Sequence, residues 1–166
     1  MTVRPIRRLG DPVLRTACDP VTDFGPALAR LVDDLMDTVH EPGRAGLAAN
    51  QIGAGLAVFA YNVDGMLGYV INPVVAATSG EQEGLEACLS IPGIGAVRRR
   101  AARVTVTGVD LDGRPVTVSG GGELARCLQH ETDHLRGELF IDGLDRAERA
   151  EVRRTLRQQA TTLGGR

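Results

Sequence analysis

Residues 122–135 read GELARCLQHETDHL, and the segment HETDH at 130–134 is the most informative part of the sequence for both the fold and the site. Apolar side chains recur at helical spacing through this stretch, which predicts a helix that begins near Glu123. Residues four apart lie one turn above each other on one face of a helix, so both histidines can reach the same metal ion. Glu131 would then lie beside the open position of that metal. The stretch predicts a catalytic metal site on a central helix.

The alternative interpretation is two partly exposed histidines on an amphipathic helix. It is disfavoured because Glu131 shares the apolar side of the helix with Leu124, Cys127, Leu128 and Leu135. A buried carboxylate without a partner would be costly there. The pattern therefore favours His130 and His134 as metal ligands and Glu131 as a catalytic base.

A catalytic metal usually takes three protein ligands and leaves one position for water. One group of metalloproteases takes its third ligand from His-x-x-x-His-x-x-Gly-x-x-His, but Phe140 stands at the last position here. A downstream glutamate is a weaker alternative, with Glu138, Glu148 and Glu151 as candidates. Upstream, Cys88 lies in a short segment between glycine and proline, and a thiolate suits Zn²⁺ or Fe²⁺. Cys88 is the favoured third ligand.

The remaining elements indicate an α+β fold, with antiparallel β-sheets built from hairpins around the central helix that carries HExxH. Residues 26–40 place four apolar side chains on one helical face, and Pro26 suits a first turn. Strands are expected at 56–63 and 67–72, the latter stopped by Pro73, and a hairpin at 103–119 turns at Asp112-Gly113. A C-terminal helix at about 145–160 completes the fold, with a thin apolar stripe and a broad exposed face.

Composition limits the class of protein. The 166 residues are 43% apolar and 24% charged, which predicts a single domain spanning residues 1–166. A net charge of -2 argues against nucleic-acid binding as the main function. The arginines at 98–100 with Arg103 are interpreted as a solvated loop, the alternative being contact with a polyanion or a substrate chain. No signal peptide or membrane span is seen, so a cytoplasmic location is expected.

Together with the ligand set, three segments make the chain resemble the peptide deformylase family. They are GLAANQ at 46–51, EACLS at 86–90 and QHETDHL at 129–135, and GDPVLR at 10–15 is similar to the start of that family. The resemblance implies a bacterial enzyme of protein biosynthesis. It would remove the formyl group from the N-terminal formyl-methionine of nascent polypeptides and release formate.

The resemblance also implies roles for individual residues. Cys88, His130 and His134 would hold one divalent metal, most often Fe²⁺ in this family, with Ni²⁺, Co²⁺ or Zn²⁺ able to substitute. Glu131 would take a proton from the metal-bound water and deliver it to the leaving amine, while the Gln51 amide and the Leu89 backbone N–H would stabilise the oxyanion. Substrate-binding positions would be Arg44, Ala45, Gly46, Ala87 and Cys127.

Two positions depart from the pattern of the family. Arg44 stands where the first motif usually has a glycine, and Ala87 stands where the second motif usually reads Glu-Gly-Cys. Both are expected to border the peptide groove, where they could narrow it or change its preference. The expected partners are formyl-methionyl nascent peptides. The ribosome is a second candidate partner, through the C-terminal helix, and a simple solvated face is the alternative.

Overall fold

Two antiparallel sheets form the β part of the fold in the computed structural model, which describes residues 2–164. The larger sheet has the strand order β1-β2-β3-β6-β7. Its strands are β1 (Gly46–Ala48), β2 (Val58–Val63), β3 (Met66–Ser79), β6 (Arg103–Val109) and β7 (Pro115–Gly121). The second sheet is a two-stranded hairpin of β4 (Gln82–Cys88) and β5 (Ile91–Arg100). The sheets are thus built from hairpins, as the sequence predicts.

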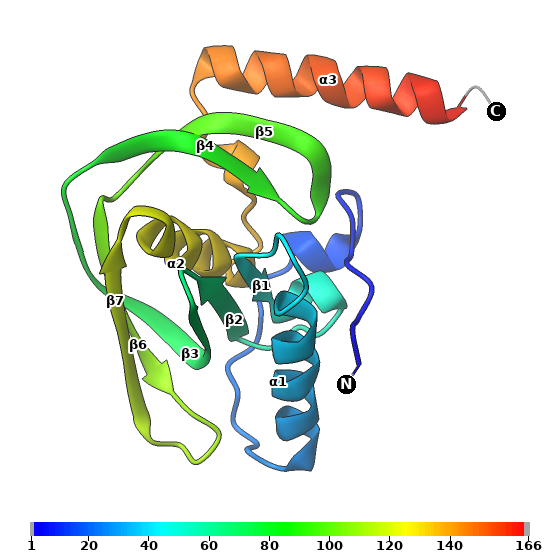
Figure 1. Ribbon diagram of the computed structural model, residues 1–166. Coiled ribbons are helices and arrows are strands. Elements are labelled where there is room, and N and C mark those ends of the chain that lie inside the picture. Colours follow the sequence, from blue (N-terminus) through cyan, green and yellow to red (C-terminus); the bar gives the residue numbers. More distant parts are fainter. Residues whose placement is uncertain (1, 165–166) are drawn as a thin grey trace.

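The central helix, α2 (Gly122–Leu135), lies between the larger sheet and the β4–β5 hairpin, which arches over it (Figure 1). Alternate residues of β2 point to opposite faces of the sheet, so Phe59 packs in the core cluster around Leu124 and Leu128 of α2. Its neighbours Val58 and Ala60 pack in the cluster around α1 (Pro26–Val39). The sheet therefore holds one helix against each face and fixes where α2 lies.

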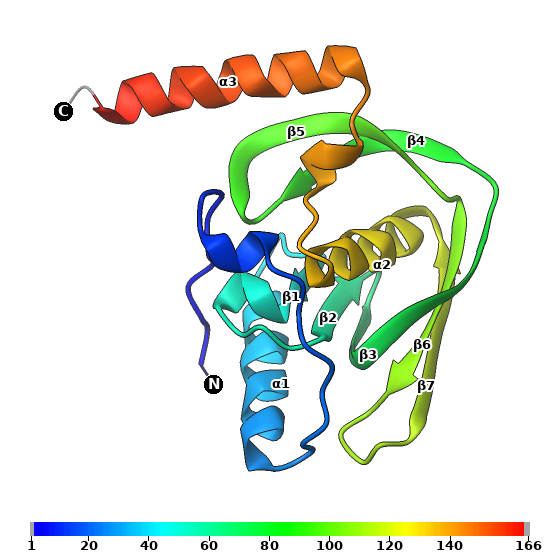
Figure 2. The same cartoon turned by 180° about the vertical axis from the view of Figure 1, so that it is seen from behind.

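The last helix, α3 (Arg146–Gly164), lies on the outer side of β5 and extends away from the body of the molecule (Figure 2). Val152 and Leu156 attach it to an apolar cluster that includes Ile91 and Phe140. Three short 3-10 helices complete the structure: η1 (Pro12–Arg15), η2 (Ala49–Ile52) and η3 (Phe140–Gly143). Within residues 2–164, no helix has both the length and the apolar character needed to span a membrane.

The predicted hairpin and helices are confirmed, and two expectations are wrong. β6 and β7 are joined by a turn at residues 110–114, where Gly113 takes a φ of 73°, in the left-handed region that glycine favours. Pro73 does not stop a strand, because β3 continues through a register shift between Ile71 and Val74. The run at 98–100 is not a loop: it is the end of β5, and two of its three arginines point inward.

Candidate metal centre

Three side chains from two elements meet at the predicted metal site. The Cys88 thiol ends β4, and His130 and His134 lie one turn apart on α2. Their ligand atoms all lie within 4.8 Å of one another, with His134 Nε2 3.3 Å from Cys88 Sγ and 3.1 Å from His130 Nε2. Metal–ligand bonds of about 2.0–2.3 Å at tetrahedral angles separate such atoms by roughly 3.3–3.6 Å. The donor set fits one divalent metal.

Charges around the site favour a cation. Burial opposes protonation of His130, but its interactions with Cys88 and Glu86 outweigh burial and raise its pKa to about 10. Burial and the neighbouring His130 lower the pKa of His134 well below its usual value. The surroundings of His130 thus favour one positive charge, which a bound cation would supply in place of the proton on that imidazole.

Glu86 orients one of the ligands. Its Oε1 lies 2.8 Å from His130 Nδ1. Burial opposes ionisation of Glu86, but hydrogen bonds from His130 and Arg100 hold its pKa well below the usual range. An ionised Glu86 accepts a hydrogen bond from the Nδ1–H of His130, which leaves the Nε2 lone pair of His130 for the metal. This carboxylate–histidine pair was not predicted from the sequence.

Glu131 lies at the cavity beside the ligands, with only 3% of its surface exposed. Burial, with contributions from Glu86 and Asp133, raises its pKa to about 7. Among the described residues, its Oε2 has no hydrogen-bond partner. A buried carboxylate oxygen with a pKa near neutrality and no protein partner is suited to exchange protons with a bound reactant.

Gln51 and Leu89 also line the cavity beside the ligands. The Ala48 N–H donates to Gln51 Oε1 at 2.8 Å, which fixes the amide so that Nε2 points to Ser90 Oγ at 3.1 Å and Cys88 Sγ at 3.7 Å. Leu89 follows Cys88 at the wall of the same cavity. The amide N–H group of Gln51 is therefore held beside the Cys88 thiol at the wall of the cavity.

A cavity of about 480 Å³ opens onto these groups. Four of the five predicted substrate-binding residues line it: Ala45, Gly46, Ala87 and Cys127. Gly46 is required by close packing, because a Cβ there would lie 2.4 Å from Glu131 Oε1 and 2.7 Å from Cys127 Sγ. Strand β1 can therefore approach α2 closely only without a side chain at this position.

Arg44 is the fifth predicted substrate-binding residue, and it does not line the cavity. Its Nη1 donates to the Thr38 carbonyl at 2.8 Å, so the guanidinium caps the end of α1. Ala87 does line the cavity, on β4 opposite Gly95 of β5. Of the two departures from the family pattern, only Ala87 places extra atoms at the groove.

The downstream glutamates lie away from the ligands. Glu138 pairs with Arg136, Glu148 accepts from the Val97 N–H, and Glu151 pairs with Arg154. Across residues 2–164, the structure offers one group of metal-ligating side chains of this kind, namely Cys88, His130 and His134. The structure therefore gives the glutamate alternative no geometric support.

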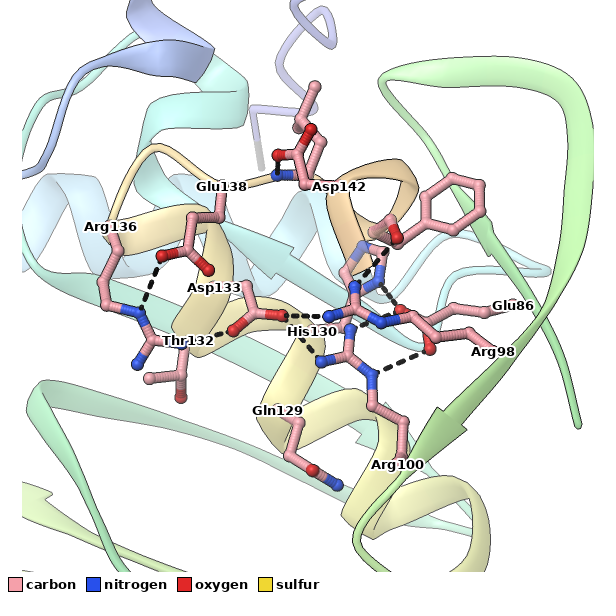
Figure 3. A network of polar contacts seen from close by, with 12 residues as sticks. Glu86, Arg98, Arg100, Gln129, His130, Thr132, Asp133, Arg136, Glu138 and Asp142 are labelled. Atoms are coloured by element: carbon pink, nitrogen blue, oxygen red, sulfur yellow. Dashed lines mark hydrogen bonds and ion pairs between the residues drawn. The ribbon is translucent and has the colours of Figure 1, made fainter. Parts of the chain in front are cut away.

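The residues that sequence reasoning missed form an ionic network next to His130, and Figure 3 shows the part of it around Arg100. Besides Glu86, they are Arg100, Arg126 and Asp133, each at most 8% exposed. A signal existed in the spacing: Arg98 and Arg100 are two apart, as are Glu86 and Cys88, so on strands each pair shares one face. Without recognising β4 and β5 as strands, that spacing carries no information.

Comparisons with known proteins agree with the geometry. The polypeptide deformylase family profile matches residues 3–150. A peptide deformylase of Acidothermus cellulolyticus is 49% identical over 158 residues, which cover 95% of this chain and 88% of the relative. A peptide deformylase of Parafrankia sp. is 51% identical over 160 residues, which cover 95% of this chain and 87% of the relative.

Solved structures show the same fold. The peptide deformylase of Legionella pneumophila superimposes with a TM-score of 0.89 at 37% identity, covering 99% of both chains. That of Thermus thermophilus gives 0.88 at 38% identity, covering 96% of both chains. With a profile match over most of its length and relatives near half identity, the chain belongs to the polypeptide deformylase family.

Proposed function

We propose that the chain hydrolyses the formyl amide of N-terminal formyl-methionine in newly made polypeptides and releases formate. Membership of the family makes it a metal-dependent hydrolase. The observation that carries the proposal is the cluster of Cys88, His130 and His134 with the Glu131 carboxylate at the same cavity. These are the parts that metal-assisted amide hydrolysis needs.

The three clustered side chains would hold the metal. When bound, a divalent metal lowers the pKa of a water molecule from about 15.7 towards 7 and polarises a carbonyl oxygen. Glu131 Oε2, which has no protein partner among the described residues, accepts a proton from water and passes it to the nitrogen of the leaving amine. The C–N bond breaks, and the products are formate and a free methionine amino group.

The formyl oxygen gains negative charge as its carbon is attacked. Gln51 Nε2 and the Leu89 backbone N–H donate hydrogen bonds to that oxygen. The Ala48 N–H fixes the Gln51 amide in advance, so little reorganisation is needed when charge develops. Ala45, Gly46, Ala87 and Cys127 form the walls against which the methionine and the following backbone pack.

Finer features of the proposal follow from the donor set and from the family. We infer that the resident metal is Fe²⁺, which a thiolate and two imidazoles suit, with Ni²⁺, Co²⁺ or Zn²⁺ able to substitute. We further infer that the chain works as one catalytic domain in a bacterial cytoplasm. Nascent peptides are its partners, and the ribosome is a further candidate.

The test is formate release from a formyl-Met peptide by Fe²⁺- or Ni²⁺-loaded protein. The same assay on Cys88→Ala should show no turnover, and metal analysis should show loss of the bound ion. A metalloprotease using only the helix would cleave internal peptide bonds and keep its metal in Cys88→Ala. A folded, metal-loaded protein that releases no formate would contradict the proposal.

A further inference from the structure

The ligands of the proposed metal site come from two separate parts of the fold. Cys88 belongs to the β4–β5 hairpin, whereas both histidines belong to α2. The hairpin is a sheet of its own and is not hydrogen-bonded to the strands that hold α2. The backbone joins the hairpin to β3 and β6 through the short links at 80–81 and 101–102, far from Cys88 in the sequence of the strands, so side-chain contacts also help to set the position of Cys88 relative to the helix.

The ionic network spans this junction. Glu86 lies two residues before Cys88 on β4, so both side chains point to the same face of the hairpin, towards α2. Besides contacting His130, Glu86 accepts a hydrogen bond from Arg126 of α2, 2.8 Å from its Nη1. Glu86 thus connects the strand of one ligand to the helix of the other two.

Arg100 connects the same parts a second time. Its Nε and Nη2 donate to the two oxygens of Glu86 at 3.0 and 2.5 Å. Its Nη1 donates to Asp133 Oδ2 at 2.6 Å, and Asp133 directly precedes His134 on α2 (Figure 3). One planar guanidinium therefore binds a carboxylate beside Cys88 and a carboxylate beside His134.

We propose that Arg100 is a positioning residue that holds Cys88 in register with His130 and His134 and so sets the affinity and geometry of the metal site. This proposal rests on one part of the proposed function, namely that Cys88, His130 and His134 bind a metal ion. Arg100 touches neither the metal ligands' donor atoms nor the cavity. It acts through Glu86, which orients His130, and through Asp133, which anchors the helix.

The chain offers a matched control one residue away. Arg99 points to the opposite face of β5, where its side chain is 77% exposed and pairs with the exposed Glu83. Arg99→Met removes the same charge and the same number of atoms as Arg100→Met, on the same strand. An effect confined to Arg100 separates the network from a general loss of positive charge on the hairpin.

The experiment is a Co²⁺ titration of metal-free wild type, Arg100→Met, Arg100→Lys and Arg99→Met, followed by the thiolate-to-cobalt absorption band and the visible cobalt bands. Substituting groups that orient metal ligands typically weakens metal binding about 10–100-fold, and we expect such a rise in Kd for Arg100→Met. We also expect shifted visible bands in its loaded form, a smaller change in Arg100→Lys, and wild-type behaviour in Arg99→Met. A merely structural role would lower the melting temperature without moving the bands.

Equal Kd values and equal spectra for wild type and Arg100→Met would overturn the proposal. If Arg100→Met does not fold, Asp133→Asn replaces it, since this variant weakens the anchor of Arg100 on α2, which Arg98 and Arg136 share, and keeps the shape of the side chain. Asp133→Asn should also raise the Kd, and an unchanged value would overturn the proposal. A wild-type protein without a thiolate-to-cobalt band would instead contradict Cys88 as a ligand, which is a failure of the proposed function.

Discussion

Helices α2 and α3 are both rich in polar side chains, yet they lie in opposite surroundings. Eleven of the fourteen residues of α2 are buried, and these include Arg126, His130, Glu131, Asp133 and His134. In α3, Val152 is the one fully buried side chain among those described. Figure 1 shows the difference directly, with α2 enclosed by the two sheets and α3 on the outside.

The comparison teaches that the partners of a helix, more than its own sequence, decide what its polar residues do. Each of the buried polar side chains of α2 named above contacts a partner from another element or lines the cavity. The charges of α3 mostly pair within the helix or face solvent, as Glu151 and Arg154 do. Buried charges without partners would be too costly to retain.

The largest expected effect is the loss of Glu131 from α2. Glu131→Ala should keep the metal but lower kcat/KM for a formyl-Met peptide by about 10²–10⁴-fold, because that is the usual contribution of a general base or acid. Glu151→Ala on α3 is the control and should leave kcat/KM unchanged. Metal loss in Glu131→Ala would mean that Glu131 is a ligand and that its assignment as a base is wrong.

The next effect concerns a charge that α2 buries behind the site. Arg126 donates to Glu86 at 2.8 Å and to the Arg98 carbonyl at 3.1 Å, with a side chain 5% exposed. Arg126→Met removes one hydrogen bond to the buried Glu86 carboxylate, which keeps its contacts with Arg100 and His130. We therefore expect the free energy of unfolding to fall by about 1–3 kcal/mol. Urea unfolding of the metal-free protein measures it. Arg153→Met on α3 should change the midpoint little, and equal losses in the two variants would contradict the comparison.

Local signals in the sequence predicted the helices and one hairpin. The period of apolar residues predicted α1 and α2, and the Asp112-Gly113 turn predicted the β6–β7 hairpin, because these signals are local. The ligand pair on α2 is local too. Cys88 was reached through its segment and through the resemblance to a family.

The ionic network could not be predicted in the same way. Glu86, Arg100 and Asp133 are separated by tens of residues, and nothing local shows that they meet. The arginines at 98–100 read as solvated because arginine on a surface is the commonest case. Glycine and proline within 91–95 also obscured β5, whose alternation places Arg100 inside and Arg99 outside. Long-range pairing decided these positions.

A smaller effect tests how tightly α2 is enclosed. A Cβ at Gly46 would lie 2.4 Å from Glu131 Oε1, so Gly46→Ala must displace β1 or the Glu131 side chain. We expect a loss of about 1–3 kcal/mol in stability, as for other overpacked sites, together with reduced kcat. Gly55→Ala is the control, since a Cβ there meets nothing within 4 Å. Unchanged stability and kcat in Gly46→Ala would show that β1 and α2 can accommodate a methyl group at this position.

The smallest effect is expected on α3. Arg154 and Glu151 form an ion pair whose side chains are 63% and 57% exposed, so water and salt screen their attraction. The hydrogen bond from Arg154 lowers the pKa of Glu151, so any stabilisation is present above the ordinary pKa of a glutamate and is lost as the pH falls through the lowered value. We expect the melting curves of wild type and Arg154→Met to agree within replicate error at pH 7 and at pH 3. The contrary outcome is a loss of stability in Arg154→Met at pH 7 that disappears at pH 3 and is as large as the loss in Arg126→Met. It would mean that exposed charges on α3 stabilise the fold as much as buried charges on α2.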